Sequence, residues 1–309
     1  MNNIKGGDLL RKYKGEIGLF IVAIIWGSGF VGTRLALDGG LTALQVVTLR
    51  FLVASLLISI VFFKNIKQNI NKEAIKAGII LGFFLFTSFL LQTKGLVYTT
   101  PSKNAFLTAV NVVIVPFIGF AVYKRKLDKI GIMSSIMTLV GIAVLSLQAD
   151  LKVNIGDALT LGGAFLFAFH IFFTSEFVNK HDAFVLTSVQ FITTFILAFI
   201  SQFVFGEGSY QNVTMSGYMG SIYLGLFSTG ICFLMQTICQ SIVDETRSAI
   251  ILSTEAVFGT IFSVIILSEV ITARMVIGSV IIFTSIIIAE TKPNIFKTRE
   301  DEKEIEASN

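Results

Sequence analysis

Long apolar stretches alternate with short polar ones along nearly the whole chain. About 20 apolar residues, each rising about 1.5 Å in a helix, cross the roughly 30 Å hydrocarbon core of a bilayer. The pattern therefore predicts ten transmembrane helices, the first to the tenth span, at 16–36, 43–63, 74–93, 102–123, 130–148, 156–178, 183–205, 215–240, 247–267 and 271–290. Most connections hold only a few residues, which leaves no room for a soluble catalytic domain.

A short segment of the third span returns in the eighth. Residues 89–93 read FLLQT and residues 233–237 read FLMQT, an offset of 144 that also aligns Lys103 with Arg247. We therefore predict an all-α integral membrane protein whose ten transmembrane helices form two inverted five-helix repeats. Residues 1–150 would be the first repeat, 151–291 the second and 292–309 a charged cytoplasmic tail. Inverted repeats of this kind enclose a site near the middle of the bilayer that opens to either side in turn.

Composition and charge agree with a membrane protein. Of the 309 residues, 54% are hydrophobic and 14% are charged, against about 25% charged residues in soluble domains. With the N-terminus inside, the inner segments carry 18 lysines and arginines and the outer ends carry four. Because cytoplasmic loops are enriched in these residues, we expect a multi-pass protein of the cell membrane with both termini cytoplasmic. The net charge of +4 then reflects topology, and no nucleic-acid partner is expected.

Polar residues at membrane depth form two stripes at helical spacing. Asn104, Thr108 and Asn111 in the fourth span lie at i, i+4 and i+7, on one face of a helix. The stripe in the eighth span consists of Thr229, Phe233, Gln236 and Gln240, and Gln92 is the repeat equivalent of Gln236. One hypothesis is a polar cavity that binds substrate. The other is hydrogen bonding between helices, which contributes on average about 0.6 kcal/mol per contact.

Glu255 is the only acidic residue well inside a predicted span. A charge at mid-membrane costs about 2.5–3.5 kcal/mol on insertion scales, so this carboxyl should be protonated, paired or hydrated. Its repeat partner is the neutral Asn111. Two hypotheses stay open: Glu255 exchanges a proton during transport, or it forms a permanently neutral hydrogen bond between helices.

Four further residues have both a functional and a packing interpretation. His170 lies among phenylalanines of the sixth span and is either a buried core residue or a substrate contact. Arg34 and Arg50 could bind a substrate carboxylate, although Arg34 can reach the outer interface and Arg50 can pack against a helix end. Trp26 is either an aromatic wall of the cavity or a packing residue.

Several motifs resemble those of a known family. They are WGSGF at 26–30, RLAL at 34–37, LRF at 49–51, STEAV at 253–257, LSE at 267–269 and Gly278. Together they resemble EamA-type members of the drug/metabolite transporter superfamily over essentially the whole chain. Two positions depart from the family pattern: Ala256 replaces the usual proline after Glu255, and His170 lies in a region that is often aromatic.

The resemblance implies a transporter, most simply an exporter, for a small metabolite such as an amino acid or a related compound. It also implies a cavity lined by the first, third, fourth, sixth, eighth and ninth spans. The predicted substrate-binding residues are Trp26, Gln92, Asn104, Thr108, Asn111, His170, Gln236 and Gln240. The predicted coupling or gating residues are Glu255, Arg34 and Arg50.

Two other classes of protein remain as alternatives. A membrane-embedded enzyme would need a cluster of catalytic groups, and the only candidates, Glu255 and His170, lie in different spans. A passive channel or scaffold would move nothing against a gradient. We expect no catalytic residue, cofactor or metal. The expected partners are a small-molecule substrate, the lipid bilayer, a proton as coupling ion and a second copy in a homodimer.

Overall fold

The computed structural model describes residues 6–124, 129–146, 154–243 and 245–291, and this part of the chain is helical without strands. The predicted tail at 292–309 lies outside it. The first half contains α1 Gly6–Asp38, α2 Ala43–Val61, α3 Phe63–Asn69, α4 Lys72–Tyr98, α5 Pro101–Thr108, α6 Asn111–Tyr123 and α7 Lys129–Ser146. The second half contains α8 Ile155–Val178, α9 Ala183–Val204, α10 Met215–Tyr223, the π-helix η1 Leu224–Ile231, α11 Cys232–Gln240, α12 Glu245–Ser253, α13 Glu255–Leu267 and α14 Ala273–Thr291.

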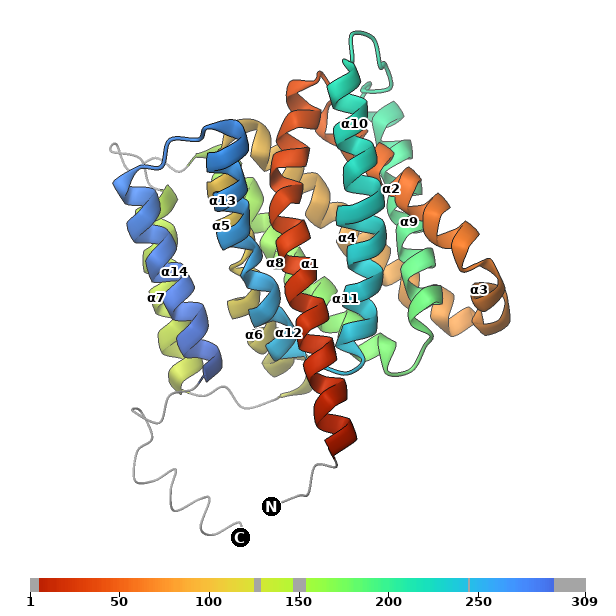
Figure 1. The fold of residues 1–309 in the computed structure, drawn as a ribbon, viewed down its shortest axis with the longest axis horizontal. Coiled ribbons are helices and arrows are strands. Elements are labelled where there is room, and N and C mark those ends of the chain that lie inside the picture. The colour runs from red at the N-terminus through yellow and green to blue at the C-terminus, as the bar shows by residue number, and fades with distance from the viewer. Residues whose placement is uncertain (1–5, 125–128, 147–153, 244, 292–309) are drawn as a thin grey trace.

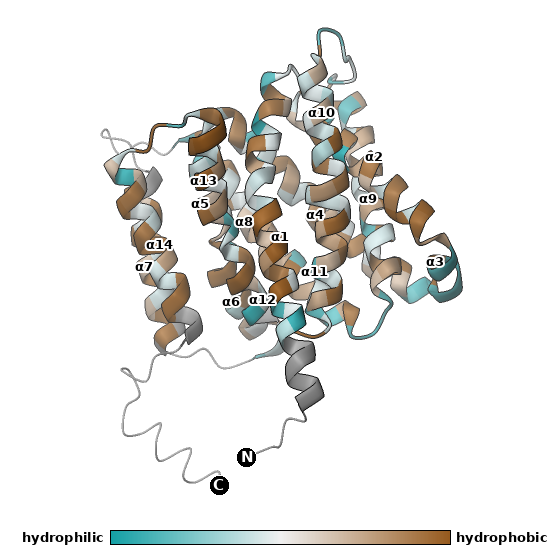
Figure 2. Ribbon diagram, in the orientation of Figure 1, coloured by the Kyte–Doolittle hydropathy of each residue, from teal (hydrophilic) through white to brown (hydrophobic). Residues whose placement is uncertain are grey.

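Eight helical segments of the described residues are long and apolar enough to cross a membrane. They coincide with eight of the ten predicted spans. The fifth and tenth predicted spans correspond to two shorter apolar helices, Ile132–Val144 and Ala273–Ile288. Figure 2 shows brown, apolar residues along most helices and teal, polar residues at α3 and in the loop beside α10.

Helix starts and breaks recur at regular intervals. Thr42 caps α2 through a capping box with Gln45, and Asp182 caps α9 at a position 140 residues later. The fourth and ninth spans are each broken once, so that α6 begins at Asn111 and α13 at Glu255, 144 residues apart. At both breaks the chain tightens, because Val113 N donates to Val110 O and Val257 N donates to Thr254 O in an i→i+3 pattern.

The π-helix η1 explains a change in the offset between the halves. Gly225, at the start of η1, lies 143 residues after Gly82 of α4, and the two glycines make matching close approaches. A Cβ on Gly82 would lie 2.6 Å from Thr193 Cβ of α9, and one on Gly225 would lie 2.6 Å from Val53 Cβ of α2. After η1 the repeated segment is offset by 144. A π turn accommodates one extra residue within a helix, so η1 absorbs this insertion without changing which residues face the centre.

The helices of the two halves pack against each other in matching combinations. In the first combination α1 packs on α10, η1 and α11, and α8 packs on α4. In the second, α1 packs on α13 and α8 on α6, while α2 pairs with α9 and α7 with α14. Figure 1 shows α7 and α14 side by side at one edge of the bundle and α1 near its centre. The N-terminal end of α1 and the C-terminal end of α14 lie at the same end of the bundle.

The other end of the bundle is marked by contact between two loops. Thr214 N donates to Gly39 O at 2.9 Å, so the turn after α1 meets the loop before α10. Gly40 adopts a φ of 94° in this turn, a conformation that glycine accepts without strain. We call this the Gly40 end.

Candidate functional site

A cavity lies near the middle of the long helices. Its volume is about 50 Å³. Since about 10–15 Å³ holds one water, the cavity in this conformation has room for a few waters. Its lining residues are Trp26, Gly29, Phe30 and Thr33 of α1, Arg50 of α2, Phe89 and Gln92 of α4, Thr108 of α5, Asn111 of α6, Phe167, His170 and Ile171 of α8, Ser228 of η1, Phe233 and Gln236 of α11, and Glu255 of α13.

Most of these residues occur in pairs at matching positions of the two halves. Three pairs are separated by 141 residues: Trp26 and Phe167, Gly29 and His170, and Phe30 and Ile171. Three more are separated by 144 residues: Phe89 and Phe233, Gln92 and Gln236, and Asn111 and Glu255. Only Thr33, Arg50, Thr108 and Ser228 lack a counterpart in the lining. Both halves therefore contribute to the cavity, mostly through residues at matching positions.

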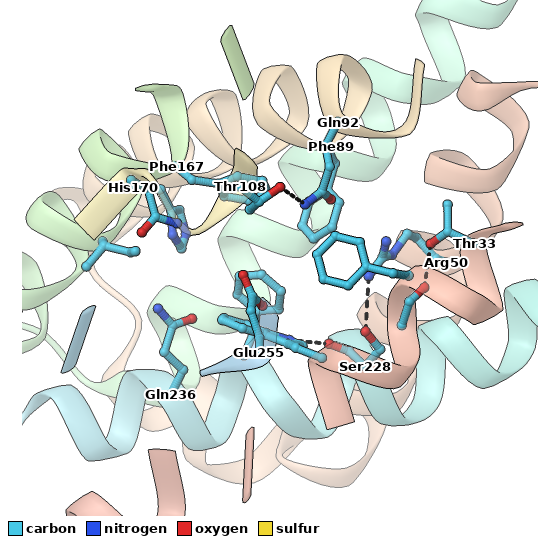
Figure 3. A pocket seen from close by; sticks show the side chains of 16 residues that line it. Thr33, Arg50, Phe89, Gln92, Thr108, Phe167, His170, Ser228, Gln236 and Glu255 are labelled. Atoms are coloured by element: carbon cyan, nitrogen blue, oxygen red, sulfur yellow. Dashed lines mark hydrogen bonds between the residues drawn. The ribbon is translucent and has the colours of Figure 1, made fainter. Parts of the chain in front are cut away.

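Arg50 supplies a buried guanidinium to the cavity. Its Nε donates to Thr229 Oγ1 at 2.9 Å. Its Nη2 donates to Ser228 Oγ at 3.4 Å (Figure 3). The guanidinium carbon also lies 4.1 Å from the centroid of the Phe89 ring, within cation–π range. Within the described residues no carboxylate forms an ion pair with it. A buried charge without an opposite charge is costly, so this site favours an anionic ligand.

Glu255 lies at the break between α12 and α13, and its side chain reaches the same cavity. The residue is 7% exposed. Among the described residues, its carboxyl has no hydrogen-bond or ion-pair partner. Figure 3 shows the Glu255 carboxyl and the Gln236 amide pointing into the space between the helices. A carboxyl in this position can accept a cationic group or a proton.

The two repeated glutamines are in different environments. Gln92 Nε2 donates to Thr108 Oγ1 at 3.0 Å. Gln236 is fully buried, and neither its Nε2 nor its Oε1 has a partner among the described residues. Buried polar atoms are nearly always hydrogen-bonded in folded proteins. The Gln236 amide is therefore available to hydrogen-bond a ligand or water in the cavity.

Aromatic rings form the walls of the cavity. Trp26 and Phe233 have centroids 4.8 Å apart, and Phe89 and Phe233 lie 5.7 Å apart edge to face. Trp26 Nε1 donates to Ser228 O at 2.7 Å, which fixes the indole against η1. His170 Nε2 lies 2.8 Å from Gln190 Oε1, so the imidazole is held by a neutral amide.

The structure brings eight of the eleven predicted site residues to the cavity. They are Trp26, Arg50, Gln92, Thr108, Asn111, His170, Gln236 and Glu255. Their roles in binding or coupling stay predictions.

Three predicted site residues lie elsewhere. Asn104 donates to Gln92 O at 3.1 Å and to Thr160 Oγ1 at 2.7 Å, so it ties α5 to α4 and α8. Gln240 donates to Ser175 Oγ at 3.1 Å. Arg34 pairs with Asp38 at 3.1 Å near the Gly40 end.

Sequence reasoning did not select several lining residues, most of them apolar. Phe89 lies in the repeated segment, and Gly29 and Phe30 lie in the motif at 26–30, so a signal existed for these three. Phe167 and Ile171 could have been found from their matching positions in the first half. Thr33 and Ser228 have no such counterpart, and only the packing of α1 on η1 brings them to the cavity.

Comparison with known proteins gives one family over both halves. A sequence model of the EamA-like transporter family matches residues 13–147 and again residues 154–291. An uncharacterized transporter of Archaeoglobus fulgidus is 30% identical over 93% of this chain and 89% of its own length. The uncharacterized transporter YoaV of Bacillus subtilis is 20% identical over 86% of this chain and 93% of its own. A solved structure described as a crystal structure of protein is 14% identical, with a TM-score of 0.69 over 93% of this chain and 99% of that chain. It is similar in fold.

Proposed function

The chain belongs to the EamA-like transporter family, and from this premise we propose that it is a secondary-active carrier that moves a small metabolite across the cell membrane by alternating access. The observation that carries the proposal is the central cavity, most of whose lining residues occupy matching positions in the two halves. A carrier of this class needs a site near mid-membrane that each half can expose in turn.

Three observations support two inverted five-helix repeats around this site. The family model matches the chain twice, once in each half. The helix breaks recur 144 residues apart, and the helices of the two halves contact each other in exchanged combinations. Since each unit would contain five crossings, the second would be inverted relative to the first. The excess of lysine and arginine on one side supports cytoplasmic termini, with the Gly40 end outside.

The chemistry of the cavity suggests the class of substrate. The Arg50 guanidinium suits a carboxylate, the Glu255 carboxyl suits an amine or a proton, and the free Gln236 amide can donate and accept. Aromatic walls suit an apolar portion. We therefore propose a small polar or amphipathic metabolite such as an amino acid or a related compound. Export as the direction rests on the family resemblance alone.

Proton coupling would follow from a change in the surroundings of Glu255. When the cavity opens to one side, water enters and favours the charged carboxylate, and when it closes the neutral form is favoured. A group whose proton affinity differs between two conformations couples protonation to the equilibrium between them. A proton gradient could then drive accumulation of substrate.

Counterflow in proteoliposomes tests this function. Ligands are first found by screening amino acids and related compounds for thermal stabilisation, because binding to the folded state alone raises apparent stability. Vesicles loaded with an unlabelled ligand should then transiently concentrate the labelled form, with saturation at high concentration. A channel would only equilibrate the label, an enzyme would change it chemically, and a scaffold would do neither. Any of these three outcomes would overturn the proposal.

A further inference from the structure

One ion pair ties the two halves together at the Gly40 end. Lys103 Nζ of α5 lies 3.2 Å from Asp157 Oδ2 of α8, and Thr99 Oγ1 donates to Asp157 Oδ1 at 2.6 Å. The Asp157 side chain is 0% exposed and that of Lys103 is 20% exposed. Arg34 Nη1 donates to Leu96 O at 3.4 Å, which places the end of α4, and the pair that follows it, beside the end of α1.

A second ion pair ties the halves together at the opposite end. Arg247 Nε of α12 lies 2.6 Å from Glu16 Oε1 of α1. The Arg247 side chain is 48% exposed and that of Glu16 is 16% exposed. Glu16 lies near the start of the membrane-crossing segment Tyr13–Asp38. A Cβ on its neighbour Gly15 would lie 2.8 Å from Val243, in the turn between α11 and α12.

The two ion pairs occupy matching positions of the halves. Lys103 and Arg247 are separated by 144 residues, and Glu16 and Asp157 by 141 residues. The same two offsets, 141 and 144 residues, relate the paired lining residues of the cavity. The first pair joins α5, which starts the fourth span, to α8 of the other half. The second pair joins α12, which starts the ninth span, to α1. The cavity lies between them.

We propose that these two ion pairs are alternating latches of the carrier, an assignment that rests on the proposed function. Both pairs are formed in this structure, and the cavity between them has a volume of only about 50 Å³. Opening toward one side would break the pair at that end while the pair at the other end stays closed. The separated charges would then be hydrated in the opened vestibule, which limits the cost of breaking the pair.

The difference in burial gives the latches unequal strengths. Asp157 has no exposed surface and holds a second hydrogen bond from Thr99, whereas the Arg247 pair is partly exposed to solvent. Screening by water weakens an exposed pair. The Arg247–Glu16 latch should therefore open more readily, and the resting carrier should favour opening at the end opposite Gly40, which is the cytoplasmic end in the proposed orientation.

The test follows the accessibility of the cavity from each side. The reporter is Thr33→Cys in a chain carrying Cys232→Ala and Cys239→Ala, labelled with an impermeant maleimide in right-side-out and inside-out vesicles. Asp157→Asn keeps the shape of the side chain and its bond to Thr99 but removes the charge. It should raise the labelling rate from the Gly40 side and lower it from the other side. Glu16→Gln should do the reverse, by about twofold to fivefold, as expected for a partly exposed pair.

Two controls separate latching from general loosening. Glu73 and Lys76 form an exposed pair 3.0 Å apart within α4, which does not join the halves, so Glu73→Gln should leave both labelling rates unchanged. Exchanging the charges with Lys103→Asp and Asp157→Lys together should restore the original labelling ratio. If Asp157→Asn does not insert into membranes, Lys103→Met breaks the same latch and carries the same expectation.

The outcomes are distinct from those that test transport itself. Opposite shifts for the two variants support the latches. Shifts of the same sign, or no shift in inserted protein, overturn them and make the pairs static ties between helices. If counterflow is absent in the unmodified chain while the opposite shifts persist, the transport function fails and the two-state closure stands.

Discussion

At the scale of single residues, the two halves carry different chemistry on matching positions. Asn111 and Glu255 each begin the second segment of a broken helix and face the same cavity, yet only Glu255 can ionise. Gly29 matches His170 in the same way. Because Asn111 carries a neutral amide at the matching position, we expect the cavity to accept a neutral amide at Glu255 as well.

Glu255→Gln should give a folded carrier that has lost coupling. The variant keeps the size and hydrogen-bonding capacity of the side chain but cannot bind or release a proton. We expect exchange of substrate at equal concentrations on both sides to persist, while accumulation driven by a pH gradient disappears. Both are measured in proteoliposomes, with the exposed Glu73→Gln as control. Normal gradient-driven accumulation in the Gln variant would assign Glu255 a structural role.

The duplicated glutamines should differ in what their loss does to stability. Gln236→Ala should weaken substrate affinity by about 0.5–1.5 kcal/mol, the net value of a hydrogen bond to a neutral group. It should leave the thermal midpoint of the ligand-free protein almost unchanged, because this amide has no partner among the described residues. Gln92→Ala should also lower the midpoint, because Thr108 loses the donor at 3.0 Å. If both variants transport substrate with unchanged affinity, the two glutamines only contribute to packing between helices.

At the scale of elements, the positions of the helices could be predicted and their irregularities could not. Hydropathy depends on the composition of a whole span, so eight candidate spans coincide with predicted ones. The breaks depend on a few backbone hydrogen bonds. Pro116 lies inside α6, but the break in the fourth span lies upstream of it, at Ala109 and Val110. An equivalent break at Thr254 has no proline within α12 or α13, so proline is not its cause.

The close approach of η1 to α2 should be sensitive to one added methyl group. In Gly225→Ala the new Cβ would lie 2.6 Å from Val53 Cβ and 2.8 Å from Arg50 O, so the helices must separate. Overpacking of this kind costs about 1–3 kcal/mol, and it would also displace Arg50 from the cavity. We expect a lower thermal midpoint in detergent and weaker substrate binding. The matched control is Gly208→Ala, because the new Cβ there would lie 3.7 Å from its nearest neighbour, the Phe203 ring, which is an ordinary van der Waals distance. Equal midpoints for the two variants would contradict the close contact.

At the scale of the whole molecule, orientation is the property on which the mechanism depends most. Gly208→Cys lies in the loop at the Gly40 end. Asp38→Cys is used in place of a cysteine at Gly40, because the φ of 94° there would strain any residue with a side chain. With Cys232 and Cys239 removed, both should react with an impermeant maleimide added outside intact cells. Lys67→Cys on α3 should react only after permeabilisation. The reverse pattern would invert the proposed topology.

The candidate site was only partly predictable at this scale. Stripes of polar residues indicated which helix faces turn inward. Thr108, Asn111 and Gln236 were selected in this way, and all three line the cavity. Asn104 and Gln240 lie on the same stripes but end in contacts between helices. Spacing along one helix cannot distinguish these cases, because the distinction depends on how far a neighbouring helix approaches at each depth.

The unequal residues on matching positions have a consequence for how a ligand is held. A site assembled from two identical halves would offer an asymmetric molecule two equivalent poses, head to tail and tail to head. Arg50 has no second arginine as its counterpart in the lining, and the counterpart of Glu255 is the amide of Asn111. The two poses are therefore no longer equivalent. Joining the two units in one polypeptide is what permits this, since mutations in one unit are not copied into the other. A single chain can thus bind an asymmetric ligand in one orientation while its two halves keep the same fold.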